Sequence, residues 1–339
     1  MSCMNSRERI NTIFNRAGAD RCGLWLGNPD KATVEIYTKA LGLSAKDELF
    51  SYFNDDCRWV LPEHNNAYKH PQGKPMWDLY EGRKALAERG LFADCEDPAE
   101  VDKFAWPSAR YLDFTQARTA VLKCPDKAVF SGMWTCFFHA MCDFFGMEEY
   151  FMKMHTNPDV VEAATEHAVN FYLEANEKYF NEVPEFDIFF MGNDFGSQLD
   201  LLVSPEMFKK FILPGFIKNI NLAKKYGKKV MLHSCGSISR IIPLLIDAGV
   251  DAIHPIQAKA AGMDAVSLAK QYKGKITFVG GVDTQELLVN ATPAQVKDEV
   301  KRLKDVLGPD LVISPSHEAV LPNVPLANIE AMVLGALEQ

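Results

Sequence analysis

Hydrophobic residues along this chain gather in short runs, and longer stretches of mixed apolar and polar residues separate the runs. Brief runs rich in Val, Ile, Leu or Phe are typical of strands that are buried on both faces of a parallel sheet. We predict eight such strands, at residues 22–26, 56–61, 128–131, 187–191, 229–233, 252–255, 277–280 and 311–314.

Helix start and stop residues fill the gaps in the second half of the chain. Ser204-Pro205 and Thr292-Pro293 each supply a cap residue followed by a first-turn proline. The predicted helices cover residues 204–226, 237–247, 264–272, 292–307 and 325 to the C-terminus. Alternating strands and helices with short links form right-handed βαβ units, and eight units close into a (β/α)8 TIM barrel. An open doubly wound sheet is the competing topology, but no G-x-G-x-x-G follows the first strand.

Residues 62–127 interrupt this rhythm. The segment contains breaks and aromatic residues, namely Pro71, Gly73, Pro75, Trp77, Tyr80, Trp106 and Tyr111. We predict that it is an N-terminal insertion that covers the mouth of the barrel. No repeat, low-complexity tract or polar linker divides the chain, so residues 1–339 are expected to form a single α/β domain.

The charge balance argues against some partners. There are 36 Lys and Arg against 45 Asp and Glu, a formal net charge of −9, and the basic residues form no cluster. Nucleic acids and anionic membranes attract a concentrated positive face, so neither is an expected partner. An anionic small substrate stays compatible with this sequence, because one local cation can outweigh the average.

Cysteine usage and the N-terminus indicate the cytoplasm. The eight cysteines lack the close spacing of a disulfide framework, which favours reduced thiols. Arg7, Glu8 and Arg9 stand where a signal peptide needs an apolar run, and no apolar run is long enough to span a bilayer. We therefore expect a soluble cytoplasmic protein.

Candidate chemistry follows the ends of the predicted strands. In barrels of this kind the active site lies where strands end and the following loops begin. The residues at these positions are Asn28, Glu63, His64, Met133, Asn193, Asp194, His233, Cys235, His254, Gln257, Asp283, His317 and Glu318. Four of the eight histidines, and His139 as a further candidate, fall on or near this rim.

The turn at His233-Ser234-Cys235-Gly236 is the central candidate. An imidazole and a thiolate two residues apart can converge on one zinc ion, and Gly236 permits a tight turn. By spacing alone, a core histidine and a buried cysteine are equally consistent with the pair. His317 follows the eighth strand on the same rim and would supply a third ligand, leaving the open position of a catalytic zinc site. A loop histidine or a general acid–base is the alternative role for His317.

Other rim residues are candidates for catalysis or substrate contact. Asp194 is a candidate base, ligand-orienting group or metal ligand, although turn-forming aspartates are common. Gly280 and Gly281 are expected to let the backbone approach a ligand closely. The expected substrate-binding residues are Asn193, His254, Gln257, Asp283 and Met133. Hydrogen bonds that only stabilise the loops would explain His254 and Gln257 equally well. The stretch at Met133 is also typical of a helix core.

Several motifs together resemble the uroporphyrinogen decarboxylase superfamily. They lie at residues 191–198, 204–208, 233–236, 248–251, 255–257, 261–264, 280–285 and 315–317. The resemblance is dense over about residues 185–335 and implies the same (β/α)8 barrel. The decarboxylases of this superfamily carry an arginine motif after the first strand, where this chain reads Trp-Leu-Gly-Asn-Pro-Asp at residues 25–30.

The resemblance therefore favours the branch of corrinoid-dependent methyltransferases similar to methylcobamide:coenzyme M methyltransferases. That branch implies zinc on the His-x-Cys pair, here His233 and Cys235, with a further cysteine that His317 replaces in this chain. It implies methyl transfer between a small methyl donor or thiol acceptor and a corrinoid (methylcobalamin) carried by a partner protein. The alternatives are a cofactor-independent decarboxylase, in which Asp194 or His317 handles protons, and a binding barrel without chemistry.

Overall fold

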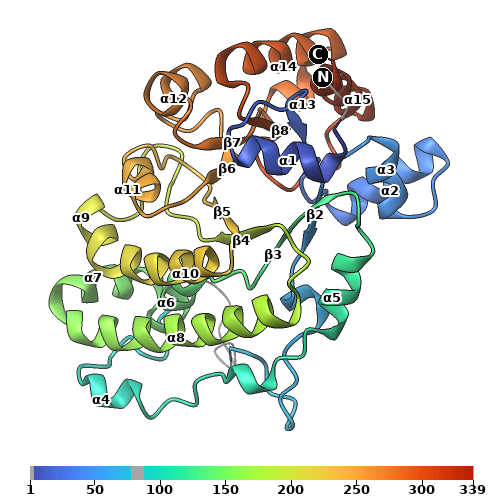
Figure 1. The fold of residues 1–339 in the computed structure, drawn as a ribbon. Helices are drawn as coiled ribbons and strands as arrows, with labels where there is room; N and C mark the ends of the chain where they lie inside the picture. The colour runs from blue at the N-terminus through green and yellow to red at the C-terminus, as the bar shows by residue number, and fades with distance from the viewer. Residues whose placement is uncertain (1–3, 78–87, 339) are drawn as a thin grey trace.

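The computed structural model describes residues 4–77 and 88–338, in which parallel strands stand at the centre and helices surround them (Figure 1). The strands are β1 (Gly23–Leu24), β2 (Cys57–Val60), β3 (Ala128–Ser131), β4 (Ile188–Gly192), β5 (Lys229–His233), β6 (Ala252–Ile256), β7 (Thr277–Val282) and β8 (Leu311–Pro315). The sheet has eight strands in the order β1-β8-β7-β6-β5-β4-β3-β2, all parallel where they pair. The predicted (β/α)8 barrel is confirmed, and β3 and β5 have the predicted bounds.

Carboxylates close the gap between β1 and β2, the two ends of the hydrogen-bonded sheet. The Asp56 N–H donates to the Leu24 carbonyl (3.0 Å), and the Leu24 N–H donates back to the Asp56 carboxylate (2.9 Å). The Leu26 N–H donates to Asp55 in the same way (3.0 Å). The Arg9 guanidinium balances the buried charge of Asp56, with Nη1 at 2.9 Å from Oδ1. Side chains thus replace part of the missing strand ladder here.

The interior of the barrel is apolar, and helix α1 (Ser6–Phe14) closes one end of it. Ile10, Ile13 and Phe14 of this helix pack with residues that begin the strands, such as Cys57 and Ala128. Because α1 closes the amino-terminal ends of the strands, the carboxyl ends are left to carry a site, as is usual for this architecture.

The helices of the second half confirm the predicted alternation. They are α9 (Pro205–Met207), a π-helical turn (Phe208–Ile212), α10 (Leu213–Lys225), α11 (Ile242–Asp247), α12 (Ala265–Tyr272), α13 (Leu287–Asn290), α14 (Pro293–Leu307) and α15 (Leu326–Leu337). The helix predicted over 204–226 is interrupted by the π-helical turn. Pro214 follows directly and lacks an N–H, so a wider turn before it disrupts the helix less than a regular turn would.

The first half contributes α2 (Lys31–Leu41), α3 (Lys46–Tyr52), a 3-10 turn (Glu63–Asn65), α4 (Pro98–Val101), a second 3-10 turn (Ala109–Tyr111), α5 (Thr115–Leu122), α6 (Phe137–Phe145), α7 (Met147–Thr156) and α8 (Pro158–Glu182). In the predicted insertion, Trp77 packs on Phe171 of α8 and Trp106 stacks on His167 of the same helix. Tyr80 lies outside the described residues. Trp77 and Trp106 therefore pack along α8, whereas Tyr111 packs on Tyr68 and His70 within the segment.

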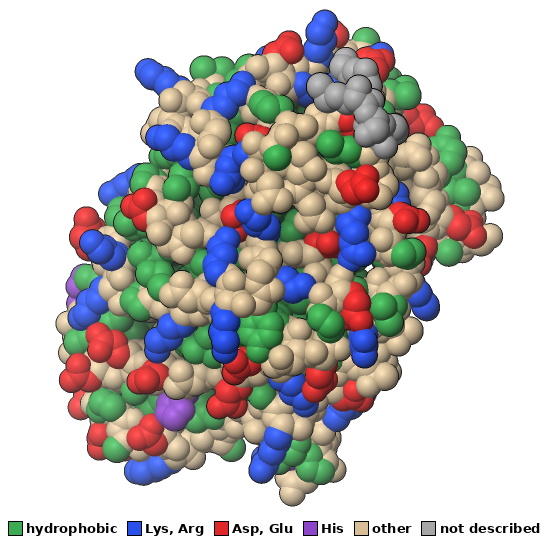
Figure 2. Space-filling model, in the orientation of Figure 1, with side chains coloured by type: hydrophobic (Ala, Val, Ile, Leu, Met, Phe, Trp, Pro, Cys, Tyr) green, Lys and Arg blue, Asp and Glu red, His purple; other side chains and the backbone are tan. Residues whose placement is uncertain are grey.

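The surface and the thiols agree with the composition. On the face drawn in Figure 2, basic and acidic side chains are interspersed. Within residues 4–77 and 88–338, no helix has the length and apolarity needed to cross a bilayer. The cysteines of the same part of the chain are free thiols.

Candidate metal and active site

Loops from three neighbouring strands meet at the carboxyl end of the barrel. Gly192 at the end of β4 pairs with His233 at the end of β5, and His233 in turn pairs with His254 of β6. The loops after β4 and β5 touch backbone to backbone, because a Cβ on Gly236 would lie 2.3 Å from the Gly196 carbonyl carbon. Gly236 also has a φ of +81°, which confirms the predicted tight turn.

Asp194, His233 and Cys235 form the first half of the site. The Cys235 Sγ lies 3.5 Å from the His233 Nε2, and an Asp194 carboxylate oxygen lies 3.3 Å from the same nitrogen. The Cys235 N–H donates to this carboxylate oxygen (2.9 Å). A thiol, an imidazole nitrogen and a carboxylate oxygen therefore converge within 4.8 Å of one another.

The loop after β8 supplies the second half, with Cys235 shared between the two. The ligand atoms of Cys235, His317 and Glu318 also lie within 4.8 Å of one another. Glu318 Oε2 is 3.7 Å from His317 Nδ1 and 4.0 Å from His233 Nδ1. The Ala319 N–H donates to His317 Nδ1 (3.1 Å), which leaves Nε2 for a ligand. We call the five residues of the two halves the rim cluster: Asp194, His233, Cys235, His317 and Glu318.

The rim cluster lacks positive charge. Within the described part of the chain, Asp194 and Glu318 make ion pairs with His233 and His317 only. Glu318 Oε2 is buried without a hydrogen-bond partner. A buried oxygen without a donor is costly, and a bound cation removes that cost. The cluster therefore fits a divalent metal ion, and its N, O and S donors suit zinc.

The pKa values of the cluster follow from this charge. Burial, and then the negative charges of Asp194 and Glu318, raise the pKa of the Cys235 thiol. Burial alone would raise the pKa of the Asp194 carboxyl, but hydrogen bonds from His233 and the Cys235 N–H hold that pKa below its usual range. A metal ion would reverse the shift of Cys235, because a cation favours the thiolate.

His254 lies behind His233. Its side chain is fully buried, and the two Nδ1 atoms are 3.0 Å apart, so one nitrogen donates to the other. Burial, with the charges of His233 and His317, lowers the pKa of His254 well below its usual value, which keeps the imidazole neutral. The structure thus places this expected substrate contact where it orients His233.

Three of the other residues expected to contact substrate, Met133, Asn193 and Asp283, are buried. Met133 is fully buried in the core, and Asn193 is fully buried between the His139 N–H and the Thr135 carbonyl. The Asp283 carboxylate accepts N–H groups of residues 285, 286 and 287 at the start of α13. All three side chains therefore have structural partners in the fold.

Gly280 and Gln257 were both expected to lie close to a ligand, and the structure gives them different surroundings. A Cβ on Gly280 would lie 2.6 Å from the backbone nitrogen of Ile256, so this glycine admits the neighbouring strand β6 and not a ligand. Gln257 accepts the Gly236 N–H through Oε1 (2.5 Å) and also faces a cavity of about 320 Å³. The other lining residues of that cavity are Thr284, Gln285, His317, Ala319, Leu321 and Asn323.

The sequence placed Glu318 and His139 on or near the rim but gave neither of them a functional role. Glu318 directly follows His317, so its place on the rim was visible, but its direction toward Cys235 was not. His139 Nε2 accepts the Asp194 N–H (3.0 Å), and burial lowers its pKa. No neighbouring ligand residue in the sequence indicated this contact of His139.

Comparison with known proteins gives one family match and several relatives. The family model described as Uroporphyrinogen decarboxylase (URO-D) matches residues 92–336. Methylated-thiol–coenzyme M methyltransferase of Methanosarcina mazei is 28% identical over 140 residues, which are 40% of this chain and 34% of that protein. Methylcobamide:CoM methyltransferase of Methanosarcina acetivorans is 27% identical over 132 residues, which are 39% of this chain and 37% of that protein. The matched stretches thus span about a third of each relative.

A solved structure extends the likeness over the full fold. A methyltransferase from Methanosarcina mazei superposes with a TM-score of 0.66 over 98% of both chains, at 18% sequence identity. At this identity the likeness concerns the fold alone.

Proposed function

Because the chain belongs to the uroporphyrinogen decarboxylase family, we propose that it is a zinc-dependent methyltransferase. It moves a methyl group between a corrinoid held by a partner protein and a small thiol or methylated small molecule. The observation that carries the proposal is the rim cluster, which gathers thiol, imidazole and carboxylate donors without a Lys or Arg partner among the described residues. The names of the two curated relatives support methyl transfer as the reaction class.

His233, Cys235 and His317 are the proposed zinc ligands. Cys235 belongs to both halves of the cluster, with His233 Nε2 at 3.5 Å from its Sγ and a ring nitrogen of His317 within 4.8 Å. Asp194 and Glu318 flank this set and balance the charge of the ion. The two carboxylates also offer alternative oxygen ligands to it.

The surrounding residues would hold the ligands in place. For His233 to bind metal through Nε2, its Nδ1–H donates to His254, which then acts as the partner that fixes the ring. Asp194 anchors the Cys235 turn by accepting its backbone N–H. We therefore assign Asp194 a role in orientation and charge balance.

The cavity beside His317 is the proposed substrate position. It holds about 320 Å³ and is lined by amide and apolar side chains next to the exposed edge of His317. Zinc supplies a cation that lowers the pKa of a bound thiol, so that the thiolate is present at neutral pH. The half-exposed His317 lies between that cavity and Cys235 and limits how a small substrate approaches the metal. A corrinoid protein would dock over the same mouth, and we expect both proteins in the cytoplasm.

Zinc content is the direct test. Protein purified without chelator should contain about one zinc per chain by mass spectrometry. Cys235→Ser and His233→Ala should lose the metal, whereas Cys124→Ser, which removes a similarly half-buried thiol elsewhere, should keep it. Wild-type protein that takes up no zinc, or Cys235→Ser that retains it fully, would contradict the metal site.

Methyl transfer is tested with free methylcobalamin in place of the corrinoid protein. The methylated thiol should form from coenzyme M or another small thiol and should depend on zinc. Carbon dioxide release from uroporphyrinogen by metal-free protein would instead support the decarboxylase alternative. Binding of methylcobalamin without transfer to any thiol would support a binding barrel without chemistry.

A further inference from the structure

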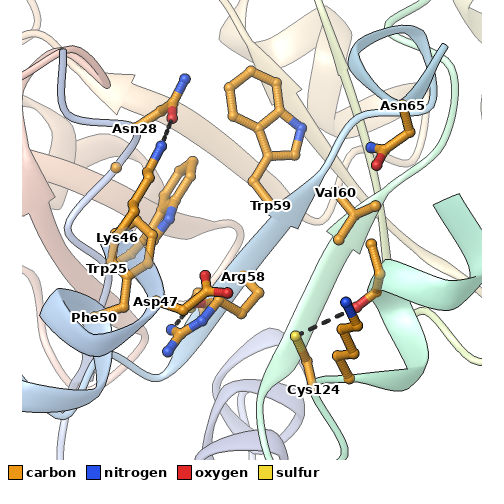
Figure 3. A pocket seen from close by; sticks show the side chains of 14 residues that line it. Trp25, Asn28, Lys46, Asp47, Phe50, Arg58, Trp59, Val60, Asn65 and Cys124 are labelled. Atoms are coloured by element: carbon orange, nitrogen blue, oxygen red, sulfur yellow. Dashed lines mark hydrogen bonds between the residues drawn. The ribbon is translucent and has the colours of Figure 1, made fainter. Parts of the chain in front are cut away.

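A second cavity lies at the seam between β1 and β2, away from the proposed metal ligands. It holds about 310 Å³ and is formed by the loop after β1, helix α3, strand β2 and helix α5 (Figure 3). We call it the seam pocket. Its lining residues are Trp25, Gly27, Asn28, Lys46, Asp47, Phe50, Cys57, Arg58, Trp59, Val60, Asn65, Ala120, Lys123 and Cys124.

The seam pocket gathers cations from three separate elements. Lys46, Arg58 and Lys123 come from α3, β2 and the end of α5, against the single carboxylate of Asp47. Within residues 4–77 and 88–338, none of the three cations lies within 4 Å of a carboxylate oxygen; Lys46 and Arg58 are half-buried and Lys123 is exposed. The pocket therefore has an excess of positive charge in a protein whose net charge is −9.

Neutral partners and an aromatic ring hold two of these cations toward the cavity. The Lys46 ammonium donates to Asn28 Oδ1 (2.5 Å), and the Arg58 guanidinium donates to the Cys57 carbonyl (2.7 Å). Both also lie over the Phe50 ring, at 5.5 Å and 4.9 Å from its centre. These contacts orient the charges but do not neutralise them, and burial lowers the pKa of Lys46.

Two indoles, those of Trp25 and Trp59, also line the seam pocket. In Figure 3 the Trp59 ring and the Arg58 guanidinium leave β2 in opposite directions, as expected for consecutive residues of a strand. Trp25 is buried, and its ring lies 4.7 Å from the His254 ring, which contacts His233 in turn. Trp25 therefore forms the closed floor of the pocket, and the partly exposed Trp59 is the indole on which an apolar group would pack.

We infer that the seam pocket binds a small organic anion, with a carboxylate, sulfonate or phosphate group on Lys46 and Arg58 and an apolar body on Trp59. Guanidinium and ammonium groups prefer these oxyanions, and a half-buried cation without a counter-ion gains most from one. The site is independent of methyl transfer, because it uses none of the rim-cluster residues.

Calorimetric titration of the whole protein tests this site with benzoate, benzenesulfonate and phenyl phosphate. Benzamide is the neutral control of the same shape. At least one of the anions should bind, and benzamide should bind about tenfold more weakly or not at all. Lys46→Met and Arg58→Met should each weaken anion binding about tenfold.

Matched variants separate the pocket from general charge effects. Lys39→Met removes an exposed lysine of α2 outside the pocket and should leave the affinity unchanged. Asp47→Asn removes the one carboxylate among the described lining residues and should tighten anion binding about threefold. If Arg58→Met does not fold, Arg58→Lys and Lys46→Met carry the test. No heat with any of the three anions, equal affinity for benzamide, or equal loss in Lys39→Met would overturn the inference.

Discussion

The rim cluster and the seam pocket carry unbalanced charge of opposite sign. At the rim, Asp194 and Glu318 have only histidine partners for their charge within the described residues, and Cys235 lies between them. At the seam, the hydrogen bonds of Lys46 and Arg58 within the described residues go to neutral groups. Buried charge is expensive unless it is paired, so each region is stabilised by a ligand of the opposite sign. The missing counter-charge, more than the residue types present, indicates which ligand each region takes.

The largest expected effect separates the two regions completely. Cys235→Ala should weaken zinc binding by more than about 100-fold, because the thiol is the ligand that both halves of the rim cluster share. Benzoate affinity at the seam should not change in this variant. Competition with a chromogenic chelator gives the first quantity and calorimetry the second; loss of both together would mean that the variant disturbs the fold.

The next effect concerns the residue that links the regions. His254 contacts Trp25 of the seam pocket on one side and His233 of the rim on the other. His254→Gln should weaken zinc binding by about 10- to 100-fold, as expected when the partner of a ligating histidine is lost. Chelator competition measures it, with His70→Gln as a control outside both sites. Unchanged zinc affinity would remove His254 from the metal site.

A pH-dependent effect is expected at Glu63, where the loops after β2 and β3 join. Its carboxylate accepts the Trp134 N–H, and the Trp134 ring packs on both Trp59 and His233. Burial raises the pKa of Glu63 to about 7. A raised carboxyl pKa stabilises the fold most below the unfolded-state value of 4.5, and this contribution is lost as the pH rises to about 7.

Glu63→Gln should therefore gain stability relative to the wild type as the pH rises from about 4.5 to about 7, by about 3 kcal/mol in total. Gln keeps an oxygen that accepts the Trp134 N–H and cannot ionise. Urea unfolding at several pH values measures the difference. A difference that is constant across this range would show that Glu63 stays ionised in the folded protein.

The smallest expected effect is that of salt. Raising the ionic strength from about 0.01 M to about 1 M shortens the Debye length from about 30 Å to about 3 Å. Benzoate binding at the seam rests on charge attraction and should weaken about threefold, and zinc binding at the rim, where the ligands would bond directly to the ion, should change less. Titrations of both ligands at the two ionic strengths measure this. Equal salt dependence would contradict this difference between the two regions.

The sequence predicted the barrel and the location of the rim. Hydrophobic runs bounded by polar residues placed all eight strands, because a strand buried on both faces needs apolar residues at every position. The His-x-Cys pair and Gly236 were identified for the same local reason, since two residues of one turn and a positive φ depend on few distant contacts. Helix α1 was missed. Its capping box joins Asn5 and Glu8, but the charged residues there were considered only as evidence against a signal peptide.

The direction of side chains on loops was decided only by the tertiary structure. Asp283 caps α13, His254 lies behind His233, and Glu318 points toward Cys235, although all three follow strands in a similar pattern. Lys46, Arg58 and Lys123 meet at one pocket from three elements that are distant in the chain. Local periodicity reports burial, but the meeting of loops depends on closure of the barrel. The sequence thus determined the location of the candidate site on the rim, and the fold decided which charged groups there have no partner of opposite charge.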